Sequence, residues 1–189
     1  SPIVTDFSEL IKGYEWQQQD YKNRSFLPRS NDGRWLWYRQ IGKYLQALNF
    51  VRNFLNIQDQ PSIYDWCGLP RIRPKAWAGV LGQPAYHSLS PEYHRNYFSQ
   101  RSTFFTYIDL QLEKESENFS RFLAAISFLK QQGLRYVAVT APFKKMAYEL
   151  SDKKTNLNSN NTLYFDSSGK TIATNTDAVG FSSLVKDIS

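Results

Sequence analysis

The sequence predicts an α/β fold, a mostly parallel sheet with helices on both faces, preceded by an incomplete βα segment. Across residues 76–189, short apolar runs rich in β-branched and aromatic residues alternate with helical patterns, which is typical of a covered parallel sheet. A charged, Pro-containing stretch at 59–75 has the composition of a connector and separates this region from residues 1–58. The length, 189 residues, suits one full domain and part of another.

Residues 1–58 have the pattern of βα units. A helix is expected to open at Asp6, whose short polar side chain can cap it. Its apolar face would be formed by Phe7, Leu10, Ile11 and Tyr14. A short stretch at 25–29 separates it from a second amphipathic run over about 35–55, and the connector contains one short helical pattern at 62–66.

The second region alternates strand and helix patterns more plainly. The expected strands are 76–82, 103–110, 135–140, 162–165 and 171–174. The last two flank Asp-Ser-Ser-Gly-Lys, a hairpin-type turn. Helices are expected from Ser90 through Phe98, over 116–131, after Pro142 and after Asp177. The apolar face of the 116–131 helix would be formed by Phe119, Phe122, Leu123, Ile126 and Leu129.

Composition narrows the classes of function. The net charge is +6, and the basic residues form no stripe along a helix, which suits an anionic small molecule better than a nucleic acid. No apolar run reaches the roughly 18 residues of a membrane span and no signal-peptide pattern opens the sequence, so we expect a cytoplasmic protein. With a single cysteine, Cys67, and two histidines, neither an internal disulfide nor a zinc site is expected.

Polar side chains follow the predicted strands at their carboxyl ends, where open α/β sheets bind ligands. Hydroxyls can bind a carboxylate and a Lys-Asp pair can bind ring hydroxyls, so the set suits a small polyhydroxylated anion. Taken singly, Ser-x-Ser-Pro and Asn-Thr-Asp are common helix caps, and a lone lysine is usually solvated. The set is His87, Ser88, Ser90, Thr140, Lys144, Asn161, Asn175, Thr176 and Asp177.

Four segments within about 76–186 resemble the substrate-binding domain of shikimate dehydrogenases. They are GVLGQPAYHSLSP, VTAPFKK, NNTL and ATNTDAVGF, in the order of that family. These enzymes reduce 3-dehydroshikimate to shikimate with NADPH. The resemblance implies that Ser88 and Ser90 bind the substrate carboxylate, with His87 bracing their loop. It further implies substrate contacts by Thr140 and Asn161, and a catalytic pair formed by Lys144 and Asp177.

The chemistry of a lysine beside an aspartate fits that resemblance. Hydride transfer to a ketone builds negative charge on the oxygen, which such a pair can stabilise or protonate. Which of the two side chains delivers the proton stays open. Lys145 would point roughly 100° away from Lys144 on a helix, so only one of them can face the cleft, and the motif favours Lys144.

The chain also departs from the family pattern. Ala138 stands where the family has asparagine, which removes one amide from the floor of the substrate site. Lys144 and Asn161 are closer in sequence than expected, so the helix between them should be short. No Gly-x-Gly-x-x-Gly turn occurs. We therefore expect the NADP-binding domain to be absent from this chain, a fragment that would be inactive alone.

Residues 1–58 bring a weaker resemblance, to the end of the type I dehydroquinate dehydratase barrel, which precedes shikimate dehydrogenase in one chain in some organisms. On it, Gln60 matches a substrate-contacting glutamine and Arg34 lies beside the carboxylate-binding arginine. The Schiff-base lysine is missing, so dehydration of dehydroquinate is not expected. A few strands cannot close an eight-stranded TIM barrel, so their apolar faces would pack on the second domain or on another copy, as a homo-oligomer.

Two classes of function remain open. The full set of reacting residues favours part of an enzyme. Ala138 and the missing Schiff-base lysine favour a catalytically silent sensor of shikimate or quinate pathway intermediates, similar to fungal quinate-pathway repressors. A Gly-rich βαβ segment downstream in the parent gene would favour the enzyme, and a DNA-binding domain would favour the sensor.

Overall fold

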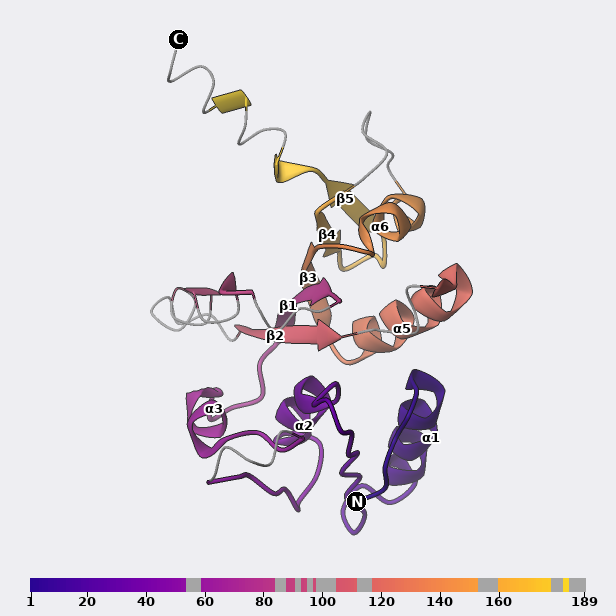
Figure 1. Ribbon diagram of the computed structural model, residues 1–189. Coiled ribbons are helices and arrows are strands. Elements are labelled where there is room, and N and C mark those ends of the chain that lie inside the picture. Colours follow the sequence, from indigo (N-terminus) through magenta and orange to yellow (C-terminus); the bar gives the residue numbers. More distant parts are fainter. Residues whose placement is uncertain are drawn as a thin grey trace. The chain divides into compact units, whose positions relative to one another are not determined.

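The chain divides into two compact units, Ser1–Lys75 and Ala76–Ser189, coloured from indigo to magenta and from magenta to yellow in Figure 1. In this computed structural model, none of the described helices is long and apolar enough to cross a membrane. The described residues are 1–53, 59–83, 88–90, 93–94, 97, 105–111, 117–152, 160–177 and 182–183.

The first unit begins with two extended segments joined by a helix. Ile3 and Arg29 form a parallel bridge, in which the Arg29 N–H donates to the Pro2 carbonyl at 2.9 Å. Between them lies α1 (Phe7–Gln18), which opens where the sequence predicts because the Asp6 carboxylate accepts a hydrogen bond from the Glu9 N–H at 3.0 Å. Parallel pairing across a helix is a βαβ arrangement, here reduced to a single bridge.

Helix α2 (Leu36–Gly42) is much shorter than the predicted run over 35–55. It ends at Gly42, a weak helix former whose carbonyl accepts a hydrogen bond from the Asn49 side chain at 3.3 Å. The Gln46 amide in turn donates to Asn49 Oδ1 at 3.1 Å. Beyond Gly42 the backbone forms tight turns, in which Tyr44 N–H donates to Ile41 O at 3.0 Å and Leu45 N–H to Gly42 O at 3.1 Å. The later described residues of the run therefore do not continue the α-helix.

An aromatic cluster forms the core of the first unit. Trp37 stacks on Phe7 with ring centroids 6.1 Å apart, and Trp35 and Tyr38 meet its ring edge-on at 6.5 and 5.8 Å. Trp35, Trp37 and Tyr38 are all buried. Aromatic pairs in these geometries contribute stability beyond the area that they bury.

Helix α3 (Ile63–Gly68) confirms the short helix predicted at 62–66. A capping box starts it, since the Ser62 hydroxyl accepts from the Asp65 N–H at 3.1 Å and the Asp65 carboxylate accepts from the Ser62 N–H at 3.2 Å. At its other end, Lys43 Nζ donates to the carbonyls of Trp66 and Leu69 at 3.0 and 3.2 Å. Residues 59–75 therefore lie within the first unit.

The second unit is built on a five-stranded sheet with the strand order β2-β1-β3-β4-β5. The parallel part confirms the α/β class, because β1 pairs in parallel with both β2 and β3. The hairpin of β4 and β5 has the predicted bounds, with Gly169 at a φ of 86° in its turn. The strands are β1 (Ala76–Gly82), β2 (Phe105–Gln111), β3 (Leu134–Val139), β4 (Thr162–Phe165) and β5 (Thr171–Thr174).

The sheet is mixed, and to that extent less parallel than predicted, because β4 runs antiparallel to β3 and β5 antiparallel to β4. The cause is the path of the chain after β3. Helix α6 (Lys144–Leu150) leaves from the carboxyl end of β3, and the chain returns to that same end, where Asn160 N donates to Lys144 O at 3.3 Å. A strand that starts where its neighbour ends must run the opposite way.

Helices α5 (Phe119–Gln131) and α6 contact each other, and they pack on β3 and β5 respectively. Leu123, predicted on the buried face of α5, is 45% exposed, since it lies roughly 100° around the helix from the fully buried Phe122. The helices predicted over 90–98 and after Asp177 lie largely outside the described residues, so cover on both faces of the sheet stays a prediction. The buried residues of α5 are Phe122, Ala125, Ile126, Phe128 and Leu129.

Candidate active site

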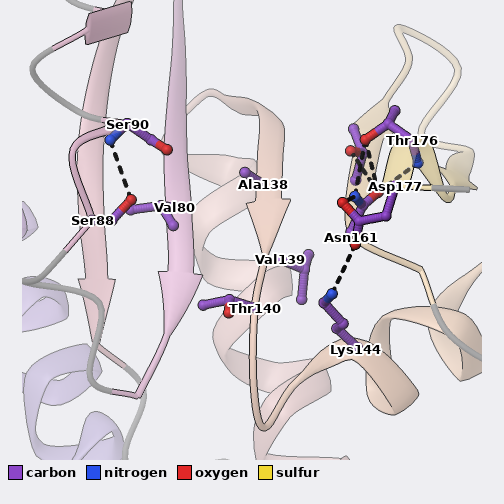
Figure 2. A pocket seen from close by; sticks show the side chains of 11 residues that line it. Val80, Ser88, Ser90, Ala138, Val139, Thr140, Lys144, Asn161, Thr176 and Asp177 are labelled. Atoms are coloured by element: carbon purple, nitrogen blue, oxygen red, sulfur yellow. Dashed lines mark hydrogen bonds and ion pairs between the residues drawn. The ribbon is translucent and has the colours of Figure 1, made fainter. Parts of the chain in front are cut away.

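A pocket of about 490 Å³ opens in the second unit, where β1 and β3 end and β4 begins. Figure 2 shows its polar side chains in two groups: the two serines beside Val80, and a second group around Lys144, with Thr140 between them. A ligand with a polar group at each end could therefore be bound at both. The pocket is lined by the six residues assigned from the family motifs, Ser88, Ser90, Thr140, Lys144, Asn161 and Asp177, and also by Thr176. Asn175, the other described residue of the predicted polar set, does not line it.

The turn between β3 and α6 places Lys144 in the pocket. Thr140 N donates to Leu81 O at 2.8 Å, which ties the turn to β1. Phe143 is fully buried and stacks on Phe122 of α5, with ring centroids 5.6 Å apart and an interplanar angle of 18°. Because Phe143 anchors the start of α6 in the core, the next side chain, Lys144, faces the pocket.

Lys144 and Asp177 form an ion pair, with Nζ 3.0 Å from Oδ2. The hydrogen bond from Lys144, together with its charge and a bond from Asn161, holds the pKa of the Asp177 carboxyl below its usual value. Asp177 is therefore ionised at neutral pH. The side chains are 38% and 65% exposed, so the pair is open to a ligand.

The Asn161 side chain joins the two segments behind this pair. Its Nδ2 donates to Asp177 Oδ1 at 2.7 Å and to Thr176 Oγ1 at 2.9 Å. Its Oδ1 accepts from the Thr176 N–H at 2.9 Å and from the Thr162 hydroxyl at 3.1 Å. The amide thus connects the residue before β4 with the residues that follow β5.

At the serine end of the pocket, the Ser88 hydroxyl makes a local hydrogen bond and can still donate one to a ligand. Ser88 Oγ accepts a hydrogen bond from the Ser90 N–H at 3.2 Å, which is the capping explanation of Ser-x-Ser-Pro. A hydroxyl that accepts one bond still has its own hydrogen to donate, so this contact leaves Ser88 able to bind an anion. The bracing role predicted for His87 lies outside the described residues.

The floor of the pocket is apolar and follows from strand register. Ala138 pairs with Val80 on one side and with Thr162 on the other, so these three side chains share a face. Sequence reasoning predicted Ala138 as a missing amide but did not single out Val80, Val139 or Thr162 as pocket residues. The strand pairing would have placed Val80 and Thr162 there, but no motif marks them.

Arg34 and Gln60 do not line this pocket, since both belong to the first unit. Arg34 is bound by its neighbours: its guanidinium pairs with the Asp32 carboxylate, with Nη2 at 2.6 Å and Nε at 2.9 Å from Oδ2, and it donates to the Thr5 carbonyl at 3.2 Å. The Gln60 carbonyl accepts from Arg52 Nε at 2.9 Å. The structure thus shows local roles for both residues, and any substrate contact of theirs stays a prediction.

Convergent polar side chains at the strand ends of an open α/β sheet are typical of domains that bind small molecules. Residues 80–161 match the family described as "Shikimate dehydrogenase substrate binding domain". The second unit is therefore similar in sequence to the substrate-binding domain of shikimate dehydrogenases.

Curated relatives agree with this match. The NADP(+) shikimate dehydrogenases of Lysinibacillus sphaericus and Bartonella quintana are 35% and 36% identical over 111 and 114 residues, which cover 57% and 58% of this chain. Those stretches cover 38% and 37% of the relatives. The chain thus spans little more than a third of the enzymes that it resembles.

Solved structures show the same fold. The shikimate dehydrogenase of Aquifex aeolicus superimposes with a TM-score of 0.51 at 26% identity, covering 60% of this chain and 42% of that one. The Thermus thermophilus enzyme, solved in complex with NADP(H) and shikimate, gives 0.50 at 24% identity, over 59% of this chain and 42% of its own, and shows the fold alone.

Proposed function

We propose that this chain is the substrate-binding part of an NADP-dependent shikimate dehydrogenase, the enzyme that reduces 3-dehydroshikimate to shikimate. One observation carries the proposal. The six residues assigned from the family motifs come from four separate stretches of sequence, and all of them line one pocket around a Lys144–Asp177 pair at 3.0 Å. Residues that served only as helix caps would have no reason to lie around a single pocket.

The two ends of the pocket suggest how the substrate lies. The hydroxyls of Ser88 and Ser90 would bind the substrate carboxylate, as neutral donors suited to an anion. The Lys144–Asp177 pair would then face the opposite side of the ring, with the reacting oxygen and its neighbouring hydroxyl. Thr140, which lies between the two groups in Figure 2, would contact the ring.

Lys144 has the chemistry that the reacting carbonyl needs. Reduction of a ketone builds negative charge on its oxygen, and an ammonium within hydrogen-bonding distance stabilises that charge. Asp177, ionised, would accept a hydrogen bond from the adjacent ring hydroxyl and hold the ammonium in place. The pair also supplies a proton path to the new hydroxyl, through either of its members.

The residues of this chain do not fit a nicotinamide cofactor. Its sequence contains no Gly-x-Gly-x-x-Gly turn, and the described pocket has no comparable phosphate cradle. We therefore propose that NADP, used by the enzymes to which this chain is similar, is bound by residues outside the sequence described here. The part played by this chain is to bind the substrate, orient it and stabilise its oxygen.

Calorimetric titration of shikimate into the 189-residue chain tests this function. We expect binding that Lys144→Ala and Ser88→Ala each weaken at least about tenfold, the usual cost of a lost charged or paired hydrogen bond in a polar site. Lys145→Ala is the matched control, since this neighbouring lysine does not line the pocket. Absence of binding to a chain shown to be folded would contradict the proposal.

A sensor remains the second candidate, and the apolar floor is the observation that favours it. Ala138 places only a methyl group between Val80 and Thr162, so the floor offers the ring no amide. The enzyme is favoured by the Lys144–Asp177 pair, because binding alone does not require a proton donor. Reduction of 3-dehydroshikimate by the parent protein, assayed with NADPH, would exclude the silent sensor.

For residues 1–58 we propose a remnant of a type I dehydroquinate dehydratase barrel, in a bifunctional parent. The parallel bridge Ile3–Arg29 supports it, since the two segments pair in parallel across α1, and parallel pairing across helices is what such a barrel requires. Exposed apolar side chains of this unit, among them Ile3 and Tyr64, support self-association through it. A cytoplasmic location, expected of a biosynthetic reductase, completes the proposal.

A further inference from the structure

Asn161 lines the pocket, and its backbone is hydrogen-bonded on both sides. Its carbonyl accepts from the Val139 N–H at 2.6 Å and its N–H donates to the Thr174 carbonyl at 3.2 Å. The backbone of Asn161 is therefore bound to the end of β3 on one side and to the end of β5 on the other. A side chain attached at such a position can hold another group steady.

The orientation of the Asn161 amide is determined by its partners. A primary amide has two hydrogens and two oxygen lone pairs, and here every one has a partner. The Thr176 hydroxyl lies near both ends of the amide, 2.9 Å from Nδ2 and 3.2 Å from Oδ1. The Thr176 backbone N–H can only donate, so the amide oxygen must face it. The Thr162 hydroxyl donates to the same oxygen, and the NH2 group is thereby directed at Asp177.

Asp177 needs such a partner. Its two oxygens are divided between two donors, Oδ1 to Asn161 and Oδ2 to Lys144. With a side chain 65% exposed, it has little packing to restrict its rotation. A carboxylate that must meet a substrate hydroxyl works best when it is held in advance of binding.

We propose that Asn161 is a positioning residue, whose amide is fixed by Thr162 and the Thr176 backbone and in turn holds Asp177 for its pairing with Lys144. This inference rests on the proposed function for its purpose, whereas the hydrogen bonds that carry it lie within the chain itself. Asn161 acts on the substrate through Asp177. The substrate contact inferred for Asn161 from the family motif is then secondary.

Substitution of Thr162 tests the proposal, because its hydroxyl hydrogen-bonds the Asn161 amide, which in turn donates to Asp177. Thr162 also lines the pocket, so the titration of Asp177, and not the affinity for shikimate, decides the outcome. Thr162→Val keeps the branched shape and strand preference of the side chain and removes the hydroxyl. Thr162→Ser keeps the hydroxyl. Thr174→Val is the matched control, since Thr174 lies directly across from Thr162 on β5 and its hydroxyl takes no part in the Asn161 network.

Two readouts on the 189-residue chain separate this proposal from the function. Carbon NMR of the Asp177 carboxyl reports its pKa without ligand, and calorimetry reports shikimate affinity. We expect Thr162→Val to raise the Asp177 pKa toward its ordinary value and to weaken shikimate binding about three- to tenfold. Thr162→Ser should restore both, and Thr174→Val should change neither.

A folded Thr162→Val chain whose Asp177 titrates as in the parent would overturn the positioning role, whatever its affinity for shikimate. A parent chain that fails to bind shikimate would overturn the proposed function instead. In that case the NMR titration still decides the role of Asn161, because it needs no ligand.

Discussion

The ion pair of Lys144 and Asp177, at the scale of single residues, adds little to stability and is open to a ligand. Exposed pairs of this kind contribute only about 0–1 kcal/mol to folding, because water screens the charges and two long side chains lose freedom. The same exposure lets a ligand replace water around both groups. Substitution of either residue should therefore affect binding far more than stability.

The protonation of Asp177 should depend on Lys144. Because the folded pKa lies below the usual 3.8, the ionised, paired form persists down to acid pH and is lost only as the pH falls through the lowered pKa. We expect carbon NMR to show the midpoint of the Asp177 carboxyl below 3.8 in the parent chain and higher in Lys144→Ala. Lys145→Ala is the control. An unchanged midpoint in Lys144→Ala would show that the pair does not form in solution.

Sequence reasoning could find the six pocket residues because motif order and strand ends both point to them. It could not find the Asn161 network. Nothing in the residue types shows that a threonine hydroxyl and a backbone N–H share one amide oxygen, since that depends on how β4 and the segment after β5 meet. Only part of the apolar floor could be predicted. The family pattern shows that Ala138 replaces an asparagine, whereas Val80 is placed beside it only by the pairing of β1 with β3.

At the scale of elements, α5 shows how a helix of this kind is stabilised. Its N-terminus is capped by Asn118, whose side chain accepts from the N–H groups of Ser120 and Arg121 at 2.8 and 3.3 Å. Its buried side packs on β3 and contacts α6, with Phe122 fully buried against Phe143. Since Phe143 precedes Lys144, the packing of α5 also supports the site.

The two neighbours Phe122 and Leu123 should respond differently to truncation. Phe122→Ala removes a fully buried ring and should lower the free energy of unfolding by about 3–5 kcal/mol. Leu123→Ala, at a position 45% exposed, should cost less than about 1 kcal/mol. Urea unfolding followed by circular dichroism compares them. Equal losses would mean that Leu123 is covered in solution.

The bounds of a helix or strand could be predicted where neighbouring residues determine them. The prediction failed where the result depends on how the chain folds back on itself. The hairpin of β4 and β5 is fixed by two short runs and a Gly-containing turn, and α1 by its cap at Asp6. The length of α2 was wrong because the chain continues in tight turns after Gly42, where the Asn49 side chain also donates to the Gly42 carbonyl. The direction of β4 depends on where the chain returns after α6, which no periodicity records.

On the scale of the whole molecule, each of the two units has its own core. The aromatic cluster around Trp37 belongs to the first unit, and the sheet with its pocket belongs to the second. Four of the five tryptophans, at positions 16, 35, 37 and 66, lie in the first unit, and Trp77 begins the second. Tryptophan fluorescence therefore reports mainly on the unit without the pocket.

Shikimate should stabilise the two units unequally. A ligand at about 100 times its dissociation constant adds roughly 2.7 kcal/mol to the unit that binds it. We expect it to raise the thermal transition seen by far-UV circular dichroism for the sheet, and to leave the transition seen by tryptophan fluorescence where it was. Equal shifts of both transitions would show that the units unfold together.

The first turn of α6 has a consequence for engineering. The helix opens with Lys144 and Lys145, with no side-chain cap and no acidic residue in its first turn. Positive charge is unfavourable there, because the N-terminus of a helix already carries the positive end of its dipole. Lys145 does not line the pocket, so a protein engineer could replace it to gain thermal tolerance without changing the pocket. Under the proposed function, the positive charge of Lys144 serves the substrate oxygen at a small cost to the stability of the helix.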